Sequence, residues 1–254
     1  MKDIKVVFMG TPDFAVSILD MLIKNTNVVG VVTQPDKEVG RHKVLTASPV
    51  KEFALKNNIQ IFQPIKIRNE YQNILDLKPD IIITCAYGQM LPMDILTNPR
   101  LGCINVHASL LPKLRGGAPL NHAIIDREST TGITIMYMDK TMDTGDIIAQ
   151  EAYLIIDSDT LKDLHDKLSI MGRDLLQQIL PEIINQTNSR IPQDNAKATY
   201  AWNIKREEEH IDFKKSGGEI DALVRGLNPH PLANIVIKDI EYKVIAGFFK
   251  KGPR

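Results

Sequence analysis

Hydrophobic and polar positions follow two different patterns along the chain, one typical of buried strands and one typical of helices. Nearly unbroken apolar and β-branched runs are typical of strands buried on both faces, and they occur at residues 4–10, 28–34, 80–88 and 102–107. Apolar positions at helical spacing indicate helices at residues 11–25, 48–58 and 118–127, and an alternating strand covers residues 132–139. This succession predicts an α/β fold, with a mostly parallel sheet covered by helices on both sides.

The helical segments carry signals for their ends. Thr11 is expected to cap the first helix, with Pro12 at the first helical position. Residues 160–185 form one long amphipathic stretch, which we expect to break near Gly172 and Pro181.

A polar segment divides the chain. Residues 186–204 have no apolar period and are expected to be a linker between a first domain, residues 1–185, and a second module, residues 205–254. The second module is expected to contain a helix capped by Ser216 and two short strands, residues 233–238 and 241–249.

Composition limits the classes of partner. Because 43% of the 254 residues are hydrophobic, the chain can fill one large or two modest domains. Lysine plus arginine and aspartate plus glutamate each number 31, so a polyanionic partner would have to bind at a local patch. Cys85 and Cys103 lack the spacing of a zinc site or disulfide framework and are expected to be buried free thiols. The sequence shows no signal peptide or membrane span, so we expect a cytoplasmic protein without membrane contact.

Two polar residues stand at the end of an otherwise apolar strand. Asn105 and His107 are two positions apart, so their side chains share one face of the predicted sheet. Ligands of such sheets bind beyond the carboxyl ends of the strands. We expect Gly88, His107 and the loop after Asp139 to meet at that edge.

Two carboxylates follow in the loop "MDTGD", at Asp143 and Asp146. A carboxylate beside a histidine orients the ring and favours its protonated form, while an asparagine amide can donate to a developing oxyanion. No serine or cysteine is placed as a nucleophile, so the pattern favours transfer of an activated group to an amine or hydroxyl without a covalent intermediate. Polar residues at strand ends are also commonly structural, and the pattern alone leaves both interpretations open.

Longer motifs resemble a known family. "GCINVHASLLPKLRGGAPLNHAI" and "TGITIMYMDKTMDTGDII" closely resemble the formyltransferases that use 10-formyltetrahydrofolate. Three further stretches resemble the methionyl-tRNA formyltransferases among them: "FMGTPDFAVSIL", "VVTQPDKEVGRHKVLTASPVK" and "CAYGQMLP". The resemblance runs from residue 4 to about residue 230 and implies a Rossmann-like N-terminal domain with a small OB-like β-barrel behind it.

The resemblance implies a reaction and a catalytic trio. Asn105, His107 and Asp143 would serve the transfer of a formyl group from 10-formyltetrahydrofolate to the α-amino group of methionine on initiator Met-tRNA. Alternatives are a formyltransferase acting on an amino-sugar nucleotide or a purine precursor, a catalytically silent tRNA- or folate-binding protein, and a folate hydrolase.

The resemblance also implies binding residues, with no metal and no stable protein partner. The folate would lie against Ser109, Leu110, Leu111, Pro112, Tyr87, Gly88 and Met90. The tRNA acceptor end would contact Lys37, Arg41 and Lys43. His230 replaces a tryptophan usual in the family, and residues 205–254 are expected to form only part of the barrel, which would weaken tRNA binding.

Overall fold

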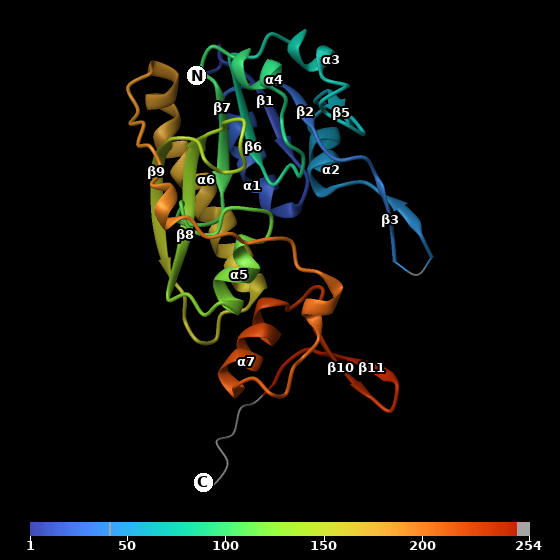
Figure 1. Cartoon of the computed structure of the whole chain (residues 1–254). Helices are drawn as coiled ribbons and strands as arrows, with labels where there is room; N and C mark the ends of the chain where they lie inside the picture. The colour runs from blue at the N-terminus through green and yellow to red at the C-terminus, as the bar shows by residue number, and fades with distance from the viewer. Residues whose placement is uncertain (41, 248–254) are drawn as a thin grey trace.

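The computed structural model describes residues 1–40 and 42–247 (Figure 1). Within them, a seven-stranded sheet has the strand order β5-β2-β1-β6-β7-β8-β9. Its strands are β1 Lys5–Gly10, β2 Asn27–Val32, β5 Ile61–Phe62, β6 Ile81–Cys85, β7 Cys103–His107, β8 Thr130–Tyr137 and β9 Ile147–Leu154. The first five strands of this order are parallel, whereas β8 and β9 are antiparallel to their neighbours. The predicted α/β fold with a mostly parallel sheet is confirmed.

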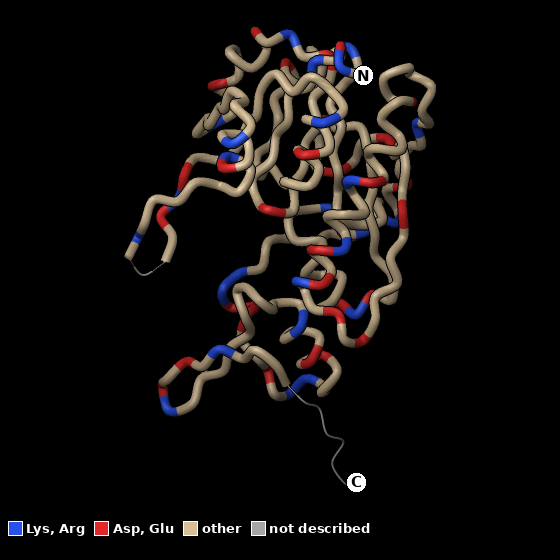
Figure 2. The backbone as a smooth tube through the Cα atoms, turned by 180° about the vertical axis from the view of Figure 1, so that it is seen from behind, with Lys and Arg blue, Asp and Glu red and all other residues tan. Residues whose placement is uncertain are grey.

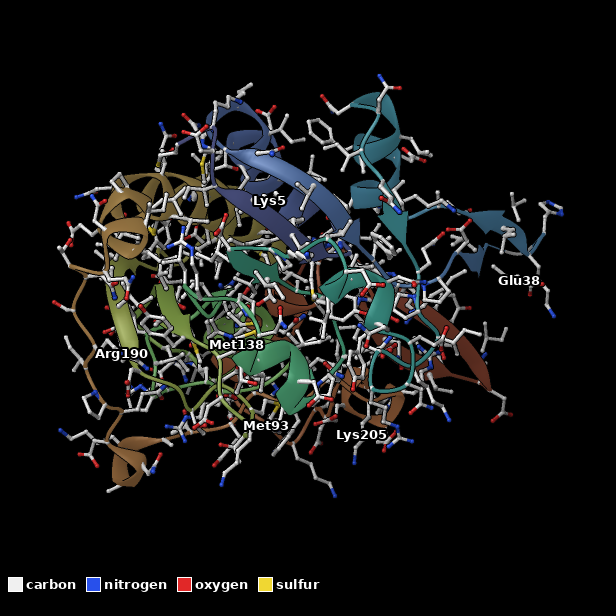
Figure 3. The ribbon with its side chains drawn as sticks, turned by 90° about the horizontal axis from the view of Figure 1, so that it is seen from above. Lys5, Glu38, Met93, Met138, Arg190 and Lys205 are labelled. Atoms are coloured by element: carbon white, nitrogen blue, oxygen red, sulfur yellow. The ribbon has the colours of Figure 1, made fainter. Side chains whose placement is uncertain are left out.

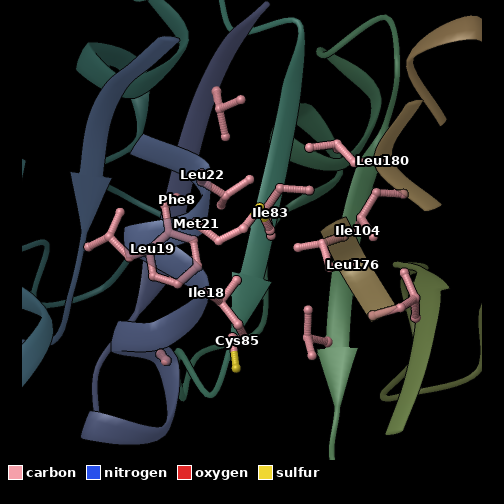
Figure 4. Packing of buried hydrophobic residues seen from close by; sticks show 14 of the residues in the cluster. Phe8, Ile18, Leu19, Met21, Leu22, Ile83, Cys85, Ile104, Leu176 and Leu180 are labelled. Atoms are coloured by element: carbon pink, nitrogen blue, oxygen red, sulfur yellow. The ribbon is translucent and has the colours of Figure 1, made fainter. Parts of the chain in front are cut away.

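Helices cover both faces of the sheet. One face packs on α1 Val16–Asn25, α2 Pro49–Lys56 and α6 Leu161–Asn185, and the other on α3 Gln72–Leu75 and α4 Met93–Thr97. Figure 4 shows the first of these cores, in which Leu22 from α1 and Leu176 from α6 belong to the same buried cluster as the strand residues Ile83 and Ile104. The strands read as continuous apolar runs because both of their faces are buried.

The first helix begins differently from the prediction. A 3-10 turn, η1 Asp13–Ala15, precedes α1, and Thr11 caps neither element. Instead, the Thr11 hydroxyl donates to the Tyr87 carbonyl (3.1 Å) and accepts from the Gln34 N–H (3.4 Å). The expected cap was wrong because the Thr11 hydroxyl instead links the loops that follow β1, β2 and β6 by hydrogen bonds.

The long helix α6 does not break at Gly172 or Pro181. A Cβ at Gly172 would lie 3.0 Å from a side-chain carbon of Val106, so the glycine lets the helix approach the sheet closely. Pro181 lies on the exposed face of α6, where the carbonyl that loses its partner can bind water. Thr160 and Asp163 form a capping box at the start of this helix.

Residues 186–204, which we call the strap, pack along the first domain. Ile191 exchanges two backbone hydrogen bonds with Ile147 in β9 (2.8 and 2.9 Å), and Tyr200 forms a parallel bridge with Arg115. The strap also contains the short turn η2 Asn195–Lys197. The segment predicted to be a plain linker is therefore hydrogen-bonded to the domain that carries the predicted site.

The second module packs against α5 Pro119–Ile125. Its elements are η3 Arg206–Glu209, α7 Gly217–Gly226, and the antiparallel pair β10 Ala233–Ile237 and β11 Ile240–Val244. The predicted Ser216 cap is confirmed, because its hydroxyl accepts from the Glu219 N–H. A small core of its own joins α7 to the strands, and Asn121 in α5 donates to the Gly226 carbonyl (2.9 Å).

Candidate active site

The strand order locates a crevice. The strand order reverses direction between β1 and β6: β2 follows β1 on one side, and β7 follows β6 on the other. The helices after these two strands therefore lie on opposite faces of the sheet, and such a switch point at the carboxyl ends of the strands is where α/β sheets form a ligand crevice. β7 lies beside β6, and its last residue, His107, ends at the same edge. The site predicted from the sequence therefore lies where α/β sheets bind ligands.

Asn105 and His107 occupy one face of β7, as the spacing predicts. Ile104 and Val106 point into the core formed with α1 and α6, so Asn105 and His107 point to the opposite face. Asn105 is half-buried, whereas His107 is only 6% exposed.

A threonine orients the asparagine. Thr84, opposite Asn105 on β6, donates its hydroxyl proton to Asn105 Oδ1 (2.8 Å). The oxygen side of the amide is thereby occupied, and the two N–H donors of Nδ2 face away from Thr84. Thr84 was not among the residues predicted from the sequence, although a threonine inside the apolar run "DIIITC" was the available signal.

A backbone carbonyl orients the histidine. His107 Nε2 donates to the Leu114 carbonyl (3.0 Å), so Nε2 carries a proton and Nδ1 is the ring nitrogen left for other partners. Leu114 adopts φ = 56°, an uncommon conformation for a bulky residue and one often found at functional sites. His107 Nδ1 faces Asp143 Oδ1 at 3.8 Å.

Asp143 reaches this site by a route that differs from the prediction. β8 is antiparallel to β7, so the loop after Asp139 starts beside Cys103, at the opposite end of β7 from His107. The expectation that this loop begins at the ligand edge was wrong, because the apolar pattern of a strand does not give its direction. The loop returns along β7, and Asp143 Oδ2 accepts from the Gly116 N–H (2.8 Å).

The second carboxylate of the loop does not join the site. Asp146 Oδ2 pairs with Arg190 at 3.1 Å, and Arg190 also lies over the ring of Tyr137. Asp146 thus secures the end of the loop, whereas Asp143 faces the histidine.

The turn after β7 divides the predicted folate residues. Ser109 is fully buried and its hydroxyl donates to the Lys113 carbonyl (2.7 Å), while Leu111 is 3% exposed and packs on β8. These two side chains build the turn and offer no surface to a ligand in this structure. Leu110 and Pro112 are half-buried and present the exposed part of the turn.

The loop after β6 behaves similarly. The side chain of Tyr87 is 4% exposed and lies in the core, and its carbonyl accepts from Gln34 Nε2 (3.0 Å). Burial raises the pKa of Tyr87 well above its usual range. Gly88 has φ = 90°, and Met90 is 53% exposed. Met90 borders a cavity of about 250 Å³ that is also lined by Lys66, Ile67, Arg68 and Gln89.

Two of the predicted tRNA-binding residues, Lys37 and Lys43, belong to a projecting hairpin that contains β3 Lys37–Val39 and β4 Val44–Thr46. Lys37 and Lys43 are exposed, whereas Arg41 lies outside the described residues. Seen from above, Glu38 marks the hairpin on the side of the molecule opposite Arg190 (Figure 3). A cavity of about 370 Å³ at the base of the hairpin is lined in part by Thr11, Gln34, Lys37 and Ser48.

Residues of both charge signs occur throughout the described part of the chain. Basic and acidic positions are interspersed along the backbone in Figure 2. Cys85 and Cys103 are buried free thiols, as predicted, and burial raises the pKa of Cys103 to about 12. In residues 1–40 and 42–247, no group of three or more His, Cys, Asp or Glu side chains could hold a metal ion, and no helix could cross a membrane.

Comparisons with known proteins identify the family. Residues 4–184 match the formyl transferase family model, and residues 203–249 match the model of the formyl transferase C-terminal domain. The chain is 50% identical over 252 residues to a methionyl-tRNA formyltransferase of Staphylococcus epidermidis, covering 98% of this chain and 81% of the relative. It is also 50% identical over 242 residues to that of Staphylococcus aureus strain MW2, covering 94% of this chain and 78% of the relative.

Solved structures support the fold. An N-formyltransferase from Helicobacter canadensis, in complex with folinic acid and dTDP-3-aminofucose, has a TM-score of 0.72 at 24% identity, covering 95% of this chain and 86% of that chain. A methionyl-tRNA formyltransferase from Clostridium thermocellum has a TM-score of 0.67 at 17% identity, covering 98% of this chain and 95% of that chain. The resemblance inferred from the sequence motifs is confirmed. The chain belongs to the methionyl-tRNA formyltransferase family of the formyl transferases.

Proposed function

We propose that this chain transfers a formyl group from 10-formyltetrahydrofolate to the α-amino group of the methionine carried by initiator tRNA, in the cytoplasm. The observation that carries the proposal is the 50% identity with a methionyl-tRNA formyltransferase over 98% of the chain. The geometry around His107 suits that chemistry. An asparagine amide, an imidazole and a carboxylate meet at the carboxyl end of β7.

Asn105 would stabilise the oxyanion. When the amine nitrogen bonds to the formyl carbon, the carbonyl oxygen becomes negatively charged. Because Thr84 occupies Asn105 Oδ1, the N–H side of the amide would be the side that donates to that oxygen. Loss of one such donor typically slows turnover by about 10²- to 10³-fold.

His107 and Asp143 would handle protons. The attacking amine must lose one proton, and N10 of the folate must gain one as its bond to the formyl carbon breaks. The Leu114 carbonyl occupies His107 Nε2, so Nδ1 is the ring atom that can accept or donate a proton. Asp143 Oδ1, at 3.8 Å, would stabilise the ring when Nδ1 is protonated.

Two surfaces would bind the substrates. We propose that Leu110, Pro112 and Met90 contact the folate, and that Lys66 and Arg68 at the neighbouring cavity suit its glutamate carboxylates. The projecting hairpin would contact the tRNA acceptor end. It exposes Lys37 and Lys43, and Val39, Val44 and Leu45 are each at least 55% exposed.

The test is an initial-rate assay with 10-formyltetrahydrofolate and methionyl-tRNA, with an amino-sugar nucleotide as the competing acceptor. Formylation of methionyl-tRNA alone is the expected result, and Asn105→Ala should slow it by about 10²-fold or more. Formylation of the sugar nucleotide in preference to the tRNA would overturn the proposed substrate. Near-normal turnover by Asn105→Ala would overturn the role of the amide.

A further inference from the structure

We propose that Gln193, in the strap, is a positioning residue that holds the Asp143 loop in its catalytic geometry. This inference rests on the role proposed above for Asp143. It assigns part of the active site to a segment whose polar, aperiodic sequence resembles a plain linker.

Gln193 clamps the main chain around Asp143. Its Nε2 donates to the carbonyl of Asp143 (2.9 Å) and to the carbonyl of Gly145 (2.8 Å). Asp143 adopts φ = 55°, so the loop here departs from the conformation that most residues prefer. One amide group therefore fixes two carbonyls of a strained loop from a point 50 residues further along the chain.

Arg115 fixes the orientation of that amide. Arg115 is 2% exposed, and its Nε and Nη2 donate to Gln193 Oε1 at 3.1 and 2.7 Å. A guanidinium has no acceptor, so the oxygen of Gln193 must face Arg115 and its NH₂ must face the loop. The reverse orientation would oppose NH₂ to the guanidinium and an oxygen to two carbonyls. Nη2 of Arg115 donates further to Asn195 Oδ1 in the strap (2.8 Å).

The carboxylate of Asp143 is held from the other side by the residue after Arg115. The Gly116 N–H donates to Asp143 Oδ2, and Gly116 has φ = 124°, which favours glycine. A Cβ at Gly116 would lie 2.5 Å from the Ala201 carbonyl, so the strap packs directly on this turn. With its main chain held by Gln193 and Oδ2 held by Gly116, Asp143 presents Oδ1 to His107.

Two substitutions test the clamp. Gln193→Ala removes both hydrogen bonds to the loop and should lower kcat about 10- to 100-fold with little change in either KM. Gln193→Glu keeps an acceptor for Arg115 but opposes a carboxylate oxygen to the two carbonyls. It should therefore loosen the Asp143 loop and lose at least as much activity as Gln193→Ala. Lys197→Ala, at an exposed position of the same segment, is the matched control and should keep normal kinetics.

A double-mutant cycle separates positioning from general stability. If Gln193 acts through Asp143, Gln193→Ala should have almost no further effect on kcat in the Asp143→Asn background. Additive losses, or normal kcat for a folded Gln193→Glu protein, would overturn the inference. Normal activity of Asp143→Asn alone would instead overturn the proposed role of Asp143, so the two failures are distinguishable.

Discussion

Replacing His107 by glutamine should separate the two roles of its ring. The Nε2 of glutamine lies about as far from the main chain as the Nε2 of histidine, so it can still donate to the Leu114 carbonyl. It offers no counterpart of the ring atom Nδ1, which faces Asp143. His107→Gln should therefore keep the free energy of unfolding within about 1 kcal/mol of the unchanged protein.

His107→Ala should cost both roles. It leaves the Leu114 carbonyl without its partner at a position where the histidine is 6% exposed, and it opens a cavity. A buried group without a partner costs about 1–3 kcal/mol, and with the cavity we expect a total loss of about 2–4 kcal/mol. For a chain of this size, that loss lowers Tm by about 4–16 °C.

Turnover should fall by about 10²-fold or more in both variants, because both lack the ring nitrogen Nδ1 that we propose exchanges protons. Initial rates of formyl transfer and thermal unfolding followed by circular dichroism measure the two effects. Normal turnover by His107→Gln would refute the catalytic role of Nδ1. A Tm as low as that of His107→Ala would refute the structural role of the hydrogen bond to Leu114.

Three further changes probe the hairpin, the helix–sheet contact and acid stability. Replacing Lys37 and Lys43 together by alanine should raise the KM for tRNA and leave the KM for folate unchanged. It should also make the slope of log affinity against log salt shallower by about 1–2, and an unchanged slope would exclude phosphate contacts by these residues. Gly172→Leu should lower the free energy of urea unfolding by about 1–3 kcal/mol, because even a Cβ at this position would lie 3.0 Å from a β7 side chain. Equal stability of the variant would show that α6 can shift away from the sheet. Burial opposes the charge of Asp159, but hydrogen bonds from Lys167 and two other groups outweigh it and lower the pKa of Asp159. Its contribution is present above about pH 4 and is lost as the pH falls further, so urea unfolding of Asp159→Asn should vary less between about pH 5 and 2, and an equal acid slope would contradict this account.

Strands and helices could be predicted from the sequence where their buried positions give a regular pattern of apolar residues. β1, β6 and β7 are buried on both faces, and their apolar runs located them closely. β9 was missed because only its first residues are buried, and the hairpin strands β3 and β4 were missed because they are exposed throughout. The direction of β8 was also out of reach, since an apolar run reads the same in parallel and antiparallel strands.

Strand geometry could pair residues of the candidate site only where they are close in sequence. Asn105 and His107 are two positions apart, and because residues i and i+2 of a strand point to the same face, the sequence predicted that their side chains lie together. The groups that orient these residues come from elsewhere: Thr84 lies 21 residues from Asn105, and the Leu114 carbonyl depends on a turn seven residues after His107. The roles of the trio came from the family resemblance, because strand-end polarity alone also fits a structural function.

The strap has a consequence for when the enzyme becomes active during its own synthesis. Domains generally fold from the N-terminus as the ribosome delivers about 5–20 residues per second. The Asp143 loop emerges 50 residues before Gln193, and Leu114 emerges 85 residues before Thr199, whose hydroxyl accepts from the Leu114 N–H. The Asp143 loop is therefore synthesised roughly 3–10 s before Gln193, which holds it by hydrogen bonds. A nascent chain that has released the whole first domain still lacks the hydrogen bonds that we propose position Asp143, until the strap has also left the ribosome.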